Sequence, residues 1–371
     1  MQHDITELLE VSRRYGSDAR YVLLGGGNTS LKIDDVMYVK ASGHALANID
    51  ASGFVAMSLP RLEAIWNKTY PEDPTQREKE VLADMMASRS DGETARPSVE
   101  ALLHAIIPFR YVVHLHPAIV NGLTCSQSGK TAAARLFPEA LWIPLVNPGY
   151  ILAKTVRDAQ AEYKKKNAKD ASLILLQNHG VFVAADTIQE IDQCYKDIMD
   201  ILQRSIVRKP IFTVVKPNAA HVALVQKAMQ TYYGGKQPYP IIANRELSTR
   251  LSNLESFASI SSSYTPDHIV YSGFAPLWVD KTVFFAKDTV SVLIELFKNF
   301  EIEHGVPAKI IAVQETAVFA INEAALLLFL DTVKVAAFTE SFGGPRFMDA
   351  NQINFIRNWE VESYRANMVA K

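Results

Sequence analysis

In the segment Tyr111-Val-Val-His-Leu-His-Pro117, residues Tyr111 to Leu115 have the composition of a buried strand, and Pro117 stops the strand pairing. Side chains two residues apart point to the same side of a strand, so His114 and His116 project together from one rigid element. This arrangement presents two imidazole nitrogens to one metal ion. The alternative is that one histidine lies in the core and the other at the end of the strand.

A third histidine stands in a tight turn between two apolar segments, Ser172 to Gln177 and Val181 to Ala185, which we expect to be strands. The turn is Asn178-His179-Gly180. A histidine in such a turn is well presented, and packing in the core does not readily explain it. As a third ligand, His179 would complete a three-histidine site.

The loop Gly25-Gly-Gly-Asn-Thr-Ser30 precedes an expected hairpin of Leu31 to Ile33 and Val36 to Lys40, which a second turn, Ala41-Ser-Gly-His44, follows. Glycines allow positive φ and close approach of a ligand, and successive backbone N–H groups can form an anion site. No helix pattern follows the loop, which argues against a dinucleotide site. The alternative is a flexible segment leading into the hairpin.

The segment Arg96-Pro-Ser-Val-Glu100 precedes an expected helix, with Ser98 as its N-cap. A capping box places the acid three residues after the cap, whereas Glu100 is two residues after it. We interpret Ser98 and the helix start as an anion site, and Glu100 as an acid/base group. The alternative is that Glu100 only compensates the helix dipole.

The composition is that of an ordinary globular protein of two domains. The chain has 371 residues, 48% hydrophobic and 21% charged, with a net charge of −2. The absence of a basic tract argues against nucleic acid and membrane as partners. Cys125 and Cys194 form no disulfide framework, the N-terminus does not resemble a signal peptide, and we expect a cytoplasmic location. We find no internal repeat.

The expected division is a domain over 1–212 and a smaller α/β domain over 213–371, with a polar linker at about 234–267. The second domain shows no catalytic constellation, and its role is left open. The other expected helices span 4–16, 58–68, 74–88, 130–136, 150–166, 187–207, 219–233, 288–304, 323–338 and 350–368, and the other strands 21–24, 268–271, 277–279, 309–313 and 318–321.

The chain resembles the class II aldolase/adducin family over roughly residues 1–210. The resemblance rests on five motifs in the family's order: Gly26-Gly-Asn-Thr-Ser30, Ala41-Ser-Gly43, Pro97-Ser-Val-Glu100, His114-Leu-His-Pro117 and Gln177-Asn-His-Gly180. It is most similar to a branch in which a rhamnulose-1-phosphate aldolase is joined to a short-chain dehydrogenase. That branch shares Val39 to Gly43, the region 265–371 and the pattern at Trp359 to Glu362. The chain stops before a dehydrogenase domain, so that activity is not carried over.

The resemblance implies an αβα sandwich with a largely antiparallel sheet, in a homotetramer with active sites between subunits. It implies zinc ligands at His114, His116 and His179, and an acid/base glutamate at Glu100. The implied phosphate-binding positions are Gly27, Asn28, Ser42, Gly43 and Ser98.

Two departures from the family pattern concern the substrate end. The second serine of the phosphate pair is Val99, so Lys32 or Lys40 would have to compensate, or the substrate carries no phosphate. Fuculose-type members also use a tyrosine beyond the histidine pair as a proton donor. Tyr150 is the first tyrosine there, and the proton donor stays unassigned.

The implied function is cleavage of a ketose 1-phosphate, similar to rhamnulose or fuculose 1-phosphate, into dihydroxyacetone phosphate and an aldehyde. Zinc would stabilise the enediolate, and burial would raise the pKa of Glu100 for proton transfer. Mn²⁺, Fe²⁺ or Co²⁺ could replace zinc. The alternatives are a sugar-phosphate 4-epimerase and a non-enzymatic, adducin-like assembly protein.

Overall fold

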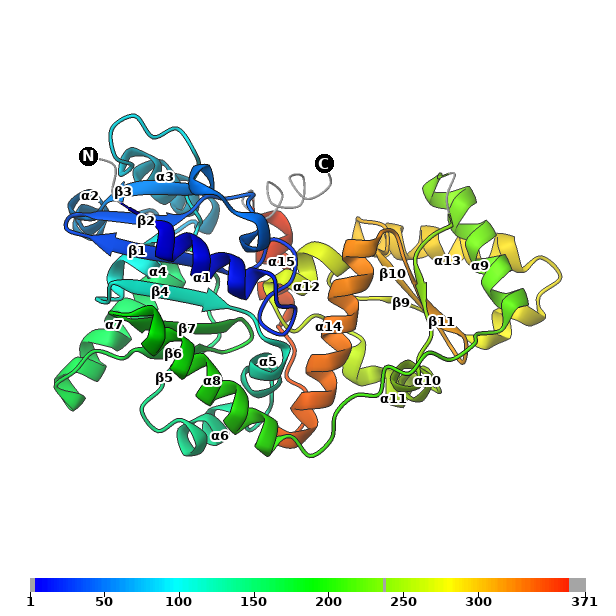
Figure 1. Cartoon of the computed structure of the whole chain (residues 1–371). Helices are drawn as coiled ribbons and strands as arrows, with labels where there is room; N and C mark the ends of the chain where they lie inside the picture. Colours follow the sequence, from blue (N-terminus) through cyan, green and yellow to red (C-terminus); the bar gives the residue numbers. More distant parts are fainter. Residues whose placement is uncertain (1–3, 236–237, 360–371) are drawn as a thin grey trace.

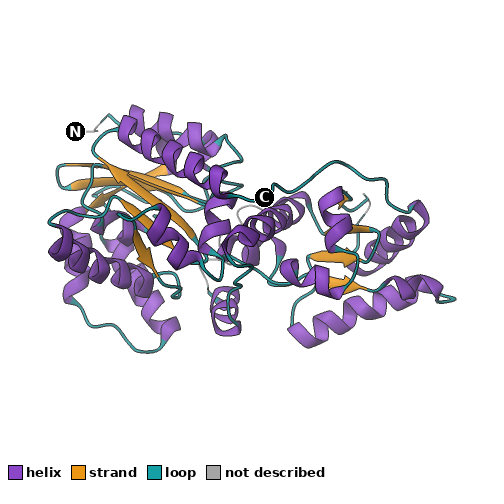
Figure 2. Ribbon diagram, turned by 90° about the horizontal axis from the view of Figure 1, so that it is seen from below, coloured by secondary structure: helices purple, strands orange, loops and turns teal. Residues whose placement is uncertain are grey.

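The computed structural model describes residues 4–235 and 238–359, which form two α/β units, each built on its own sheet (Figure 1). The larger sheet has the order β3-β2-β1-β4-β7-β6-β5, and the smaller has the order β8-β11-β10-β9. Figure 2 shows helices on both faces of the larger sheet. The expected αβα sandwich with a largely antiparallel sheet, followed by a smaller α/β unit, is confirmed.

In the first unit every pair of neighbouring strands is antiparallel except β5 and β6, which are parallel. Its strands are β1 (Asn28–Ile33), β2 (Val36–Lys40), β3 (Phe54–Ser58), β4 (Tyr111–Leu115), β5 (Leu141–Ile143), β6 (Leu173–Leu176) and β7 (Gly180–Ala185). Its α-helices are α1 (Thr6–Gly16), α2 (Leu59–Ala64), α3 (Pro74–Ala87), α4 (Ala101–Ile106), α5 (Ala118–Thr124), α6 (Gly129–Leu136), α7 (Tyr150–Asn167) and α8 (Ile188–Ser205).

Strand β4 lies in the middle of the larger sheet and is buried on both faces. Tyr111, Val113 and Leu115 pack in the core under α1, α5 and α8. Val112 belongs to the opposite core, which contains residues of α2, α3, α4 and α7. The alternation along the strand therefore places His114 on the same face as α4.

Two expected elements of the first unit differ from the structure, and three observed elements were not predicted. Residues 21–24 form no strand, and β3, α5 and β5 are the elements that were not predicted. The helix expected to start at Ser98 begins at Ala101, with Glu100 in the N-cap position, because the chain turns at 98–100 and Ser98 accepts from the backbone N–H of Glu100.

The second unit continues directly from the first. Segment 234–267, expected to be a polar linker, contains a strand and two α-helices instead, because Asn244 and Asn253 cap the helices and Leu247, Phe257 and Tyr264 are buried. Its elements are α9 (Ala219–Tyr233), β8 (Ile241–Ile242), α10 (Arg245–Arg250), α11 (Leu254–Phe257), α12 (Pro266–Ser272), β9 (Leu277–Val279), α13 (Thr289–His304), β10 (Ile310–Val313), β11 (Ala317–Ala320), α14 (Glu323–Thr339) and α15 (Ala350–Asn358).

Two more expectations for this unit concern helices. Residues 268–271 belong to helix α12 rather than to a strand, because Thr265 caps a helix that Pro266 opens. The final helix ends at Asn358 within the described residues. The remainder of the expected helix, with residues 360–362 of the Trp359 pattern, lies outside them.

No repeat was found in the sequence, but the smaller sheet has the topology of half of the larger one. Strands β4-β7-β6-β5 and β8-β11-β10-β9 have the same order and the same pattern of parallel and antiparallel pairs. In both units a helix joins the parallel pair and another follows the hairpin. The second unit is therefore a topological copy of the second half of the first.

The hairpin turns of the two units match in detail. Gln177 N–H donates to Ile143 O at 3.0 Å, and Gln314 N–H donates to Val279 O at 2.9 Å. The next residues, Asn178 and Glu315, both have positive φ, 56° and 53°. The sequences Gln177-Asn-His-Gly-Val-Phe182 and Gln314-Glu-Thr-Ala-Val-Phe319 share only Gln, Val and Phe.

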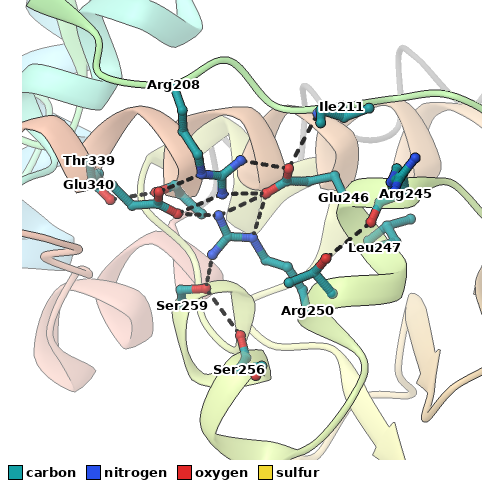
Figure 3. A network of polar contacts seen from close by, with 12 residues as sticks. Arg208, Ile211, Arg245, Glu246, Leu247, Arg250, Ser256, Ser259, Thr339 and Glu340 are labelled. Atoms are coloured by element: carbon teal, nitrogen blue, oxygen red, sulfur yellow. Dashed lines mark hydrogen bonds and ion pairs between the residues drawn. The ribbon is translucent and has the colours of Figure 1, made fainter.

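The two units pack against each other through α5 and α14 (Figure 1). At Gly122 of α5, an added Cβ would lie 2.3 Å from the Cβ of Phe338, so glycine permits the close approach. An ion-pair network adds a second connection (Figure 3). Arg208, just after α8, bonds Glu246 at 2.8 Å and Glu340 at 2.7 Å, and Arg250 joins both carboxylates.

Candidate active site

The structure brings His114, His116 and His179 together. His114 and His116 come from the end of β4, and His179 comes from the turn between β6 and β7. One ring nitrogen from each histidine lies within 4.8 Å of the others. The Nε2 atoms of His114 and His116 are 2.9 Å apart.

Hydrogen bonds at Nδ1 determine which nitrogens point into this cluster. His114 Nδ1 donates to Val181 O at 3.0 Å, and His116 Nδ1 lies 2.5 Å from Asp267 Oδ2. Burial lowers the pKa of His114 well below its ordinary value, so this ring is neutral and its Nε2 has a lone pair. Two Nε2 lone pairs that face each other at 2.9 Å repel unless a proton or a cation lies between them. A metal ion satisfies both Nε2 lone pairs, and the donor set therefore fits one.

The turn that carries His179 is held from the second unit. Asn178 takes the left-handed conformation, and its Nδ2 donates to Tyr264 O at 3.0 Å and to Arg346 O at 2.7 Å. These bonds fix the backbone next to His179. The His179 Nε2 then lies 3.3 Å from Glu100 Oε1.

Glu100 faces the histidines and is 7% exposed. Its Oε2 accepts from Asn28 Nδ2 at 2.5 Å, whereas its Oε1 has no hydrogen-bond partner among the described residues and lies 3.5 Å from His114 Nε2. Burial raises the pKa of Glu100, but the three imidazoles and the Asn28 amide lower it by more, to about 2. The expected net rise of this pKa is therefore wrong for the chain alone.

The sequence analysis did not assign a role to His104, which orients Asn28. His104 Nε2 contacts Asn28 Oδ1, and His104 Nδ1 lies 2.7 Å from Ser30 Oγ. Burial lowers the pKa of His104 to about 3, so the ring is neutral. An amide oxygen can only accept, so Nε2 carries the hydrogen and the Asn28 NH₂ group is turned toward Glu100. The sequence feature that could have identified His104 is its spacing, one helical turn after Glu100.

A pocket opens beside Glu100 and contains all five expected phosphate-binding residues. Gly27 and Gly43 have positive φ, 66° and 87°, at its wall. Its lining residues are Gly25, Gly27, Asn28, Lys40, Ser42, Gly43, Ser98, Val99, Glu100, His116, Pro148, His179, Pro266, Asp267 and Trp359.

Of the two lysines considered in place of a second serine, only Lys40 lines this pocket. Its Nζ donates to Gly25 O at 2.9 Å and to His44 O at 2.8 Å. Lys32 Nζ instead donates to the backbone oxygens of Ile107 and Phe109 and lines a different cavity.

The family model described as "Class II Aldolase and Adducin N-terminal domain" matches residues 6–196. The chain belongs to this family. A curated Bacillus subtilis protein, the uncharacterized oxidoreductase YuxG, is 26% identical in an alignment over 310 residues that covers 74% of this chain and 42% of that protein. The chain thus spans less than half the length of this relative.

Solved structures are similar to about half of the chain. The N-terminal class II aldolase domain of a conserved protein from Thermoplasma acidophilum is 27% identical, covers 55% of this chain and 94% of that chain, and has a TM-score of 0.46. An L-fuculose-1-phosphate aldolase from Thermus thermophilus is 16% identical, covers 54% and 92%, and has a TM-score of 0.35.

Three pocket residues, Pro266, Asp267 and Trp359, come from the second unit, outside the part that the family model matches. The sequence analysis missed Asp267 and Pro266 because no local pattern marks them. Tyr150 packs between Trp66 and Tyr70, and none of the described pocket residues is a tyrosine. In the described part of the chain, no helix is long and apolar enough to cross a bilayer.

Proposed function

We propose that the protein is a metal-dependent class II aldolase that cleaves a ketose 1-phosphate, similar to rhamnulose or fuculose 1-phosphate, into dihydroxyacetone phosphate and an aldehyde. One observation carries the proposal. The Nε2 atoms of His114 and His116 and the Oε1 of Glu100 converge at one end of a polar pocket, where Oε1 has no hydrogen-bond partner among the described residues.

His114, His116 and His179 would hold the ion, with Zn²⁺ as the first candidate and Mn²⁺, Fe²⁺ or Co²⁺ as others. The bound metal would supply Lewis-acid stabilisation of negative charge on the substrate oxygens. Glu100 would take the proton next to the carbonyl in the synthetic direction and return it during cleavage. Its Oε1 is free for this task because the Asn28 amide holds only Oε2.

The phosphate end of the substrate would lie in the same pocket. Gly27 and Gly43 would offer backbone N–H groups, and Ser42 and Ser98 hydroxyl groups. Lys40 would add positive charge in place of the missing second serine. Asn28 was expected to bind phosphate, but its side chain bonds Glu100 and His104, so we assign it to the orientation of Glu100.

We further propose that residues 1–212 form the catalytic domain and residues 213–371 a second domain, and that a homotetramer is the working assembly in the cytoplasm. Size-exclusion chromatography with light scattering tests the assembly. A monomeric, fully active protein would contradict it.

The test of the function is product analysis with a panel of ketose 1-phosphates that includes rhamnulose 1-phosphate. The aldolase predicts equal amounts of dihydroxyacetone phosphate and aldehyde, with Glu100→Gln as the inactive control. A 4-epimerase would give an isomerised sugar phosphate and no free carbonyl fragments. Metal-loaded protein that converts none of these substrates would contradict the proposal and favour an adducin-like role.

A further inference from the structure

We propose that Asp267, which the second unit supplies, is a positioning residue that orients His116 for metal binding. The inference rests on the proposed function in one respect, because it assumes that the three histidines hold a metal ion. It goes beyond that function by giving residues 213–359 a part in the site.

Helix α12 brings Asp267 to the pocket. Thr265 caps the helix through its hydroxyl, Pro266 opens it, and Asp267 lies in its first turn. The Asp267 Oδ2 is 2.5 Å from His116 Nδ1, and the two side chains are only 9% and 11% exposed. A hydrogen bond to a carboxylate, shielded from water in this way, is among the stronger ones in proteins.

The contact settles which nitrogen of His116 faces the histidine cluster. A carboxylate accepts the Nδ1 hydrogen, so Nε2 keeps the lone pair that a metal needs. It also fixes the plane of the ring, and a carboxylate partner strengthens the imidazole as a ligand. His114 has a weaker version of the same arrangement, with Val181 O as its partner.

The same segment reaches the third ligand. Tyr264 O, three residues before Asp267, accepts from Asn178 Nδ2 next to His179. The glycine loop also leaves room for the carboxylate, because a Cβ added at Gly26 would lie 2.8 Å from Asp267 Oδ2. Segment 264–267 therefore contacts His116, the residue next to His179, and the glycine loop at the pocket wall.

This placement explains what the copied unit contributes. The strand pairing aligns the two units residue by residue. His114 pairs with Phe182, and Ile241 pairs with the matching Phe319, so Ile241 stands at the position of His114. Ala243 then stands at the position of His116. Thr316 stands where the first unit has His179. The copy cannot build a three-histidine site of its own, and it acts on the first site through α12.

The test measures Zn²⁺ affinity of the full-length protein by competition with a chromophoric chelator. Asp267→Ala should weaken Zn²⁺ binding about 10–100-fold, the range typical for loss of such a partner. Asp267→Asn, which keeps the shape but loses the charge, should give a smaller loss. The Co²⁺-loaded Asp267→Ala variant should show a shifted visible absorption spectrum, which a merely structural role would leave unchanged.

The matched control is Asp331→Asn. Asp331 Oδ2 lies 3.2 Å from His268 Nε2, so it is also a buried carboxylate beside a histidine, but it does not line the pocket. This variant should bind Zn²⁺ like the wild type. Unchanged Zn²⁺ affinity and Co²⁺ spectrum in folded Asp267→Ala would overturn the inference and leave the proposed function intact. Wild-type protein that binds no metal would overturn both.

Discussion

Gln177 and Gln314 occupy the same position in two copies of one hairpin. Each donates its backbone N–H to the parallel neighbouring strand, to Ile143 O and Val279 O respectively. Two residues further on, the first copy has His179 and the second has Thr316. The glutamine shared by both hairpins therefore belongs to the folding of the hairpin, whereas His179, which only the first hairpin has, belongs to the candidate metal site.

We predict that His179→Ala loses metal and activity together, because two histidines and a carboxylate cannot replace the third imidazole. Metal content measured by plasma mass spectrometry should fall from one equivalent per chain to near zero. Thr316→Ala, the change at the matching position, should keep the full equivalent. A His179→Ala protein with stoichiometric metal would contradict the ligand assignment.

We predict that Glu100→Gln keeps the metal and loses about 10²–10⁴-fold in kcat, the usual contribution of a general acid/base. The amide is similar in shape, but it cannot take up the proton. Steady-state kinetics and metal analysis on the same preparation check this. Near-normal turnover would remove Glu100 as the acid/base group.

Val99→Ser should lower KM for a phosphorylated substrate, because it adds a hydroxyl donor to the pocket wall beside Ser98. A charge-assisted hydrogen bond to phosphate contributes at most about 1.5–3 kcal/mol, so a decrease in KM of up to roughly 10–100-fold is expected. Val99→Ala is the control for lost methyl groups and should not lower KM. An equal effect of both variants would show that this position does not face a phosphate.

Acid should destabilise the protein through His104. The unfolded chain protonates this histidine near pH 6.5, whereas the folded protein keeps it neutral down to a pKa of about 3. The unfolded state binds the extra proton in this range, so the free energy of unfolding falls as the pH drops from 6.5, by at most about 1.4 kcal/mol per pH unit.

Urea unfolding at pH 7 and pH 5, with chelator present to remove metal effects, measures this loss. His104→Gln has no titrating group at the position and should lose less stability between the two pH values than the wild type. An identical loss in both proteins would show that His104 is not the source.

The close packing of the two units should tolerate no added methyl group at Gly122. Gly122→Ala places a Cβ against Phe338, and overpacking of this kind costs about 1–3 kcal/mol. Chemical denaturation should show this loss in the free energy of unfolding. Unchanged stability would mean that α5 and α14 separate easily.

Much of the first unit could be predicted because its signals are local. The strand Tyr111–Leu115 was predicted with the bounds that the structure shows, and the structure brings its two histidines to the turn that carries His179. Period-two spacing, a following proline and a glycine-bounded turn are all visible within a few residues. Glu100 was assigned as the acid/base group from its place at the helix start and from the family resemblance, but its position beside the histidines was not predicted.

The second unit was harder to predict because its signals are weak or distant. Ile269-Val270-Tyr271 has strand-like composition, but the cap at Thr265 and the proline after it start a helix. The repeated strand topology was not predicted because the two hairpins share few residues. Asp267 is 151 positions from His116, and no local pattern predicts a contact across that distance.

The most direct test of the account is whether cleavage of a ketose 1-phosphate depends on a metal bound at the three histidines. Cleavage by the wild type should stop when a chelator removes the metal and return when one equivalent of Zn²⁺ per chain is added. His116→Ala should stay inactive after the same addition. Cleavage that continues in fully metal-free protein, or that Zn²⁺ restores in His116→Ala, would contradict the account.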